Sequence, residues 1–209
     1  MNKLTALFGG LLLALGLATP ALAANVPNLS CDTSVTGGTY KNVTVKPGDS
    51  CTLLGVTVLG NVHARDAVDV KILDTNVGHN IMVMRAIGDV VIGNRGCAYD
   101  PLAGNNLMVK DSHNVAICQM SVDNNLVVTG NDGRIGVFSN RVGNNIMVSR
   151  NDAYVGTSSH GNPDFARVRN NTVAGHIQVF SNARQVVLKN NITVKGYQCN
   201  GNTPAAIGC

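Results

Sequence analysis

Acidic, basic and ring-bearing side chains gather in two stretches that interrupt the otherwise regular apolar pattern of this sequence. The stretches cover about residues 94–103 and 157–165. With one residue just beyond the second stretch, they supply the candidate binding residues Arg95, Tyr99, Asp100, His160, Asp164 and Arg167. Carboxylates beside guanidinium groups suit the binding of an acidic sugar polymer. Hydrolysis of such a polymer requires two carboxylates about 5 to 9 Å apart, and each stretch holds a single Asp. We therefore predict binding here and assign no catalytic residue.

A second group consists of Met and His side chains, each two positions after a repeated Asn. These are His63, Met82, Met108 and Met147, and Val127 and Gln178 occupy the same place in two further repeats. We call these six residues the contact stripe. Thioether and imidazole groups suit Cu(I), but residues stacked on neighbouring strands lie about 4.8 Å apart, too far to chelate one ion without rearrangement. We predict no metal and no cofactor, and interpret the stripe as an exposed contact surface for a partner or for self-association. A loop or the N-terminal arm covering the stripe is the alternative.

The cysteines form a third group with chemical potential. An even number of cysteines in an exported chain favours disulfides over metal thiolates. Six cysteines allow fifteen pairings, and proximity in the repeating fold described below predicts three pairs, which are Cys31 with Cys51, Cys97 with Cys118, and Cys199 with Cys209. The first and last pairs would cap the two ends of the domain.

A repeat must position these groups. Its unit is Asn, aliphatic, any residue, aliphatic, and it begins at Asn42, Asn61, Asn80, Asn106, Asn125, Asn145, His176 and Gly196. Once the two long stretches are removed, the period is 19 to 20 residues throughout. Two further apolar columns accompany each unit, one about eight and one about three residues before the repeated Asn. Three short alternating strands per period predict one coil of a solenoid.

The expected fold is therefore an all-β, single-domain parallel β-helix of about eight coils. Its bore would hold two files of aliphatic side chains, typified by Val62 and Ala64, and the repeated Asn residues would form a ladder at one corner. The pattern does not set the handedness, and a right-handed helix is the general expectation. Both insertions are expected between the second and third strands of their coils, and so at one corner.

The N-terminal residues predict export. Lys3, the apolar run of residues 7–17 and the small residues Ala21 and Ala23 match a signal peptide over residues 1–23, which leaves 24–209 as the β-helix domain. No later segment is apolar enough to span a membrane. The net charge of +4 is too small to indicate a nucleic-acid partner. We expect a secreted or periplasmic protein.

Three segments, two near the start of the domain and one in its tail, carry a family resemblance. The segments Gly38-Thr-Tyr-Lys-Asn-Val-Thr-Val45 and Val58-Leu-Gly-Asn-Val62, with the tail Gln198-Cys-Asn-Gly-Asn-Thr-Pro204, resemble a group of bacterial secreted short parallel β-helix proteins with Gly-Asn-aliphatic-x-Val repeats. The resemblance implies the fold and export, but no activity. The chain departs from that pattern in its richer Met and Asn content and its longer second insertion.

The sequence thus predicts a non-enzymatic exported β-helix for adhesion, surface structure, or binding of a polysaccharide or a cell-surface protein. The alternative is a polysaccharide-active lyase or hydrolase that acts at the insertions, by analogy with other β-helix proteins.

Overall fold

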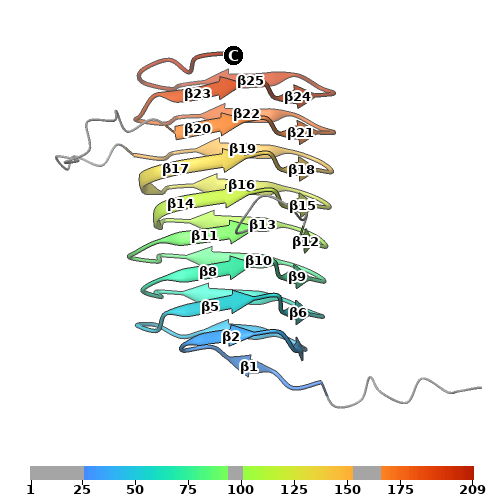
Figure 1. Cartoon of the computed structure of the whole chain (residues 1–209). Coiled ribbons are helices and arrows are strands. Elements are labelled where there is room, and N and C mark those ends of the chain that lie inside the picture. Colours follow the sequence, from blue (N-terminus) through green and yellow to red (C-terminus); the bar gives the residue numbers. More distant parts are fainter. Residues whose placement is uncertain (1–25, 94–100, 153–165) are drawn as a thin grey trace, which may run out of the picture.

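The computed structural model describes residues 26–93, 101–152 and 166–209. Within these ranges the chain forms strands β1 to β25 and no helix, and the strands assemble into three parallel sheets that wind into one solenoid (Figure 1). No helix in the described part of the chain is long and apolar enough to cross a membrane. The predicted all-β parallel solenoid is confirmed, and its handedness stays a prediction.

Each coil contributes one strand to each of the three sheets. Sheet A has nine strands in the order β1 (Leu29–Ser30), β4 (Val43–Val45), β7 (Val62–Arg65), β10 (Ile81–Met84), β13 (Leu107–Lys110), β16 (Leu126–Thr129), β19 (Ile146–Ser149), β22 (Ile177–Phe180) and β25 (Tyr197–Asn200). Sheet B has eight, in the order β2 (Ser34–Thr36), β5 (Cys51–Leu54), β8 (Val70–Leu73), β11 (Val90–Gly93), β14 (His113–Cys118), β17 (Asp132–Phe138), β20 (Ala166–Arg169) and β23 (Val186–Lys189). Sheet C has eight short strands, which are β3 (Thr39–Tyr40), β6 (Thr57–Val58), β9 (Asn76–Val77), β12 (Leu102–Ala103), β15 (Ser121–Val122), β18 (Arg141–Val142), β21 (Thr172–Val173) and β24 (Ile192–Thr193).

Neighbouring strands pair in register, so equivalent residues of successive coils stack. Ile81, for example, pairs with Val62 on one side and Leu107 on the other. The two inward files of sheet A are completely buried, and they consist of Val62, Ile81, Leu107, Leu126, Ile146 and Ile177, then Ala64, Val83, Val109, Val128, Val148 and Val179. Aliphatic side chains stacked at strand spacing exclude water from the narrow bore. The predicted inward assignment is confirmed.

Left-handed residues turn the chain at the A–B and B–C corners of successive coils. At the A–B corner, positive φ angles of 50 to 68° occur at Asp66, Arg85, Asp111, Gly130, Arg150, Ser181 and Gly201. At the B–C corner, left-handed φ angles occur at Gly55, Asp74, Gln119, Ser139, Asn170 and Asn190. A residue with a positive φ reverses the direction of the chain sharply, which lets three straight strands close into one coil.

Asn residues follow these turns in the C-terminal half of the solenoid. They form one ladder at the A–B corner, Asn131, Asn151, Asn182 and Asn202, and another at the B–C corner, Asn140, Asn171 and Asn191. All are buried except the last member of each ladder, which is half-buried. Asn151 is fully buried, and its amide donates to Val128 O and Asn182 Oδ1. Its own Oδ1 accepts from the backbone and the side chain of Asn131. Sequence reasoning did not identify these ladders.

Two of the three predicted disulfides are confirmed. Cys31 in the first coil is bonded to Cys51 on β5 of the second coil, and Cys199 on β25 is bonded to Cys209. Each bond ties down an end of the solenoid, where core and strand edges need capping. Cys97 lies outside the described residues, so its pairing with Cys118 stays a prediction.

The expectation that both insertions leave the same corner is wrong. The strands that flank the first insertion are β11 and β12, which belong to sheets B and C. Those that flank the second are β19 and β20, which belong to sheets A and B. The error arose because Ala166–Arg169 forms a sheet B strand with only two apolar residues, and the sequence pattern alone did not distinguish it from the insertion.

Candidate functional site

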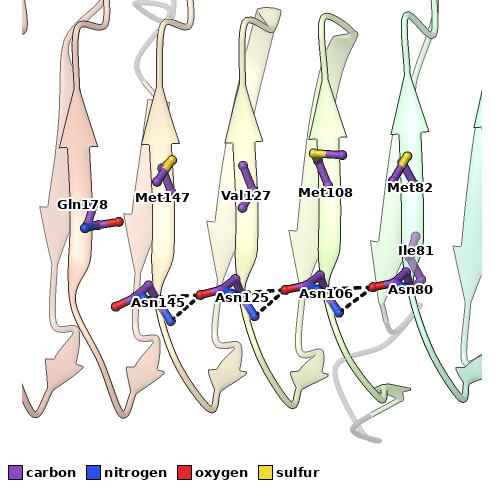
Figure 2. A pocket seen from close by; sticks show the side chains of 10 residues that line it. All are labelled: Asn80, Ile81, Met82, Asn106, Met108, Asn125, Val127, Asn145, Met147 and Gln178. Atoms are coloured by element: carbon purple, nitrogen blue, oxygen red, sulfur yellow. Dashed lines mark hydrogen bonds between the residues drawn. The ribbon is translucent and has the colours of Figure 1, made fainter.

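The contact stripe runs along the outer face of sheet A. His63, Met82 and Met108 are paired in register on β7, β10 and β13, and the column continues in register through Val127, Met147 and Gln178. His63 is exposed and the other five side chains are half-buried. Figure 2 shows the Met and Val side chains side by side on neighbouring strands, pointing away from the bore. The predicted outward assignment of the stripe is confirmed.

A shallow groove lies over this stripe. One cavity of about 450 Å³ is lined by stripe residues from Met82 to Gln178 and by Asn80, Asn106, Asn125 and Asn145. A second cavity of about 500 Å³ adjoins it towards the N-terminal end and shares Asn80 and Met82 with it. Among the residues that line the two cavities, His63 is the single titratable side chain. The groove is therefore an uncharged surface that follows the solenoid axis.

The repeated Asn residues form the ladder that borders this groove. The backbone N–H of Asn61 donates to Asn42 Oδ1 at 2.9 Å, and that of Asn80 donates to Asn61 Oδ1 at 3.1 Å. The pattern continues coil by coil to His176, whose backbone N–H donates to Asn145 Oδ1 at 2.8 Å. Figure 2 shows the side-chain part of this ladder between Asn80 and Asn145. The predicted corner ladder is confirmed.

The central amides of this ladder have little hydrogen-bonding capacity left. Asn125 Nδ2 donates to Asn106 Oδ1 and to Asn124 Oδ1, so both of its protons are used. Its Oδ1 accepts from the backbone and the side chain of Asn145. Asn106 is equally occupied, since its amide donates to Asn80 and Asn105 and its Oδ1 accepts twice from Asn125. A side-chain amide has two N–H donors and two acceptor lone pairs, and all of these are used in Asn106 and Asn125. The methionines are therefore the groups here that remain to contact a ligand.

A charged surface occupies the A–B corner instead. A cavity of about 730 Å³ is lined there by side chains that include Arg85, Asp111, His113, Asp132 and Asp152. His113 Nδ1 lies 2.7 Å from Asp132 Oδ1, an acid–base pair on neighbouring coils. Sequence reasoning did not assemble this corner. The available signal was the spacing of 19 and 20 residues between His113, Asp132 and Asp152, which repeats the period of the solenoid.

One ion pair at this corner, between Arg85 and Asp66, shifts the pKa values of both of its members. Arg85 donates to Asp66 through Nε at 2.5 Å and through Nη2 at 2.7 Å. These hydrogen bonds hold the pKa of Asp66 below its ordinary value of 3.8 and raise the pKa of Arg85. Both side chains are more than a third exposed, so solvent screens the attraction.

Most of the predicted insertion site falls outside the described residues. The residues that lie outside are Arg95, Tyr99, Asp100, His160 and Asp164. The prediction that they form one binding site is therefore not tested by the structure. Arg167 lies on β20, half-buried, in register with Gly136 and Val187 on the face of sheet B. It is on a different sheet from the contact stripe.

Within the described ranges, no group of three or more His, Cys, Asp or Glu side chains is arranged to hold a metal ion.

Comparison with known proteins finds no family that matches this chain, no similar curated protein and no similar solved structure.

Proposed function

We propose that this protein is an exported, non-enzymatic β-solenoid that binds another protein through the groove over its contact stripe. The observation that carries the proposal is the combination of half-buried methionines with a ladder of satisfied amides along one uncharged groove. Apolar side chains gathered on one flat face are a common feature of protein contact surfaces. Unbranched methionines adapt their shape to different apolar partners.

The chemistry of the groove favours an apolar segment of a protein over a sugar polymer. An acidic glycan would need cationic partners, whereas His63 is the one titratable side chain along the groove. A neutral glycan would need free donors and acceptors, and Asn106 and Asn125 have used theirs within the ladder. The five strands from β10 to β22, about 4.8 Å apart, present a surface about 20 Å long. This length suits a short extended peptide segment.

The test is a binding comparison with a displayed library of random peptides. The parent protein should select peptides rich in apolar residues. Replacing Met82, Met108 and Met147 with Lys should weaken binding of the selected peptides at least tenfold, because three charges would need to be desolvated on contact. A matched control replaces the exposed residues Leu59, Ile87 and Ile192 with Lys and should bind as the parent does. Equal loss in both variants, or none in the stripe variant, would contradict the proposal.

A glycan-cleaving function has a specific observation in its favour, at the charged A–B corner. Asp132 and Asp152 stand on successive coils beside an open cavity, with His113 paired to Asp132. Strand spacing of about 4.8 Å is close to the separation of about 5 Å that a retaining glycosidase needs between its carboxylates. Release of reducing ends from acidic polysaccharides by the parent, abolished in Asp132→Asn and Asp152→Asn, would establish this function. Absence of release from a panel of such polymers would leave the non-enzymatic proposal standing.

A further inference from the structure

One contact in the contact stripe differs from the rest. His63 Nε2 lies 2.9 Å from Met82 Sδ, across the boundary between β7 and β10. Spacing of the strands alone would keep these side chains about 4.8 Å apart, but their tips converge. A thioether sulfur is a weak hydrogen-bond acceptor, so the pair gains little from a hydrogen bond in solvent.

We propose that His63 and Met82 bind a soft monovalent cation, Cu(I) or Ag(I), between them. Imidazole nitrogen and thioether sulfur are ligands that Cu(I) prefers over carboxylate or carbonyl oxygen. Both side chains project outward from in-register strands, so the backbone already holds the two metal-ligating side chains next to each other. The adjoining cavity of about 500 Å³ is open to solvent around His63 and Met82, which gives the ion access.

The geometry suits an ion that needs few ligands. With the metal–nitrogen and metal–sulfur bond lengths of zinc sites, about 2.0 and 2.3 Å, as a guide, the two ligand atoms of a bridging ion lie about 4.3 Å apart, slightly less than the strand spacing. The two tips therefore separate by about 1.4 Å from their present contact to admit the ion, which rotation of an exposed and a half-buried side chain allows. Met108 is the next residue in register with Met82, on the side away from His63, so His63 and Met82 are the two ligands of this site. Zinc and calcium sites instead require three or more nitrogen, thiolate or oxygen ligands.

This site does not depend on protein binding by the groove. The metal proposal uses the N-terminal end of the stripe, whereas the peptide test replaces three methionines along its length. A Met147→Lys variant places a charge in the groove and leaves both metal ligands in place, because Met147 lines the first cavity and not the one around His63. Weakened peptide binding with an unchanged Ag(I) shift at Met82 in that variant separates the two proposals.

The experiment is a titration with silver nitrate in chloride-free buffer, followed by NMR of methionine methyl groups labelled with ¹³C. One equivalent of Ag(I) should shift the Met82 methyl signal. Three methionines serve as internal controls, because Met84 lies two residues further along β10, Met147 lies further along the stripe, and Met120 is buried. Ag(I) bound to a thiol elsewhere would not move the Met82 signal. Competition for Cu(I) against bicinchoninate under anaerobic conditions should give the same ranking of variants.

Substitution of His63 decides the assignment. His63→Ala should weaken Ag(I) binding at the Met82 methyl at least tenfold, whereas His79→Ala, which removes an exposed histidine outside the stripe, should leave it unchanged. Circular dichroism should show that both variants keep the parent's β-structure. Equal shifts at Met82, Met84 and Met147, or binding that survives His63→Ala, would overturn the proposal.

Discussion

Ladders of stacked Asn side chains occur in two environments, at the corners of the C-terminal half and along the groove on sheet A. In both, Asn residues at the period of the repeat form a ladder of amides from coil to coil. The corner amides of Asn131 and Asn151 are completely buried, whereas those of Asn106 and Asn125 in the groove are partly exposed. A buried amide must be satisfied by the protein itself, while an exposed one can turn to water.

This difference separates what holds the solenoid together from what it presents to its surroundings. Nδ2 of Asn151 bonds the backbone oxygen of Val128 inside the corner, and Asn131 and Asn182 make the equivalent bond to Val109 and Val148. In the groove, Nδ2 of Asn125 bonds to other side chains of the ladder. We infer that the buried ladders are structural, and that the groove ladder serves as an inert border to the methionines.

The strongest test of this comparison is removal of one buried amide. Asn151→Ala would leave Val128 O and the backbone N–H of Asn131 without their partners. A buried polar group left unsatisfied costs about 1 to 3 kcal/mol, so we expect the free energy of unfolding to fall by about 3 to 5 kcal/mol. Urea denaturation followed by circular dichroism measures this loss. A loss under 1 kcal/mol would show that water replaces the amide and that the corner is not sealed.

The terminal disulfides provide the next largest effect. Cys31 and Cys51 are buried, and their bond closes 20 residues of chain. Replacing both with Ala should cost about 3 kcal/mol by loop-entropy reasoning and expose the first coil to limited proteolysis. The bond between Cys199 and Cys209 spans 10 residues and its cysteines are half-buried and exposed, so its removal should cost less. A larger loss on removing the Cys199–Cys209 bond would contradict this and show that the C-terminal end depends more on its disulfide.

An amide in the groove should matter less than one at a buried corner. Asn125→Ala removes a comparable set of hydrogen bonds, but water can reach the groups left behind. We expect a loss of about 1 kcal/mol in the free energy of unfolding, measured under the same conditions as for Asn151→Ala. Equal losses in the two variants would remove the distinction between structural and exposed ladders.

The exposed pair of Arg85 and Asp66 should have the smallest effect, and one that depends on pH. The pKa of Asp66 in the folded protein lies below 3.8, so folding favours the ionised carboxylate. This stabilisation is present above about pH 4 and is lost as the pH falls through the lowered folded-state pKa. Arg85→Gln should raise the Asp66 pKa, which NMR titration measures. The urea midpoints of the variant and the parent should converge in acid. Arg150→Gln, at the equivalent position of another coil, should leave the Asp66 pKa unchanged.

The sequence predicted the regular parts of this fold because they repeat locally. Residues such as Ile81 and Val83 alternate with exposed ones in every coil, so their inward direction follows from the period. The disulfide of Cys31 with Cys51 followed from a separation of one coil. The ladder that contains Asn80 followed from recurrence of the same residue at the same point.

The irregular parts could not be predicted in this way. Asn151 looks like an exposed turn residue until its partner 31 residues later, Asn182, is known to stack on it. The charged corner joins His113 to Asp132 through the register of neighbouring coils. The approach of His63 to Met82 depends on side-chain rotamers, which the strand spacing does not fix.

The most direct test of the central claim, that the groove is the contact surface, is site-specific photo-cross-linking. A photoreactive residue at Val127, in the middle of the contact stripe, should capture the apolar peptide selected by the parent protein. The same residue at Ile87, which is 72% exposed and lines the charged corner, should capture none. Capture at position 87 and not at 127 would contradict the account and move the binding surface to the A–B corner.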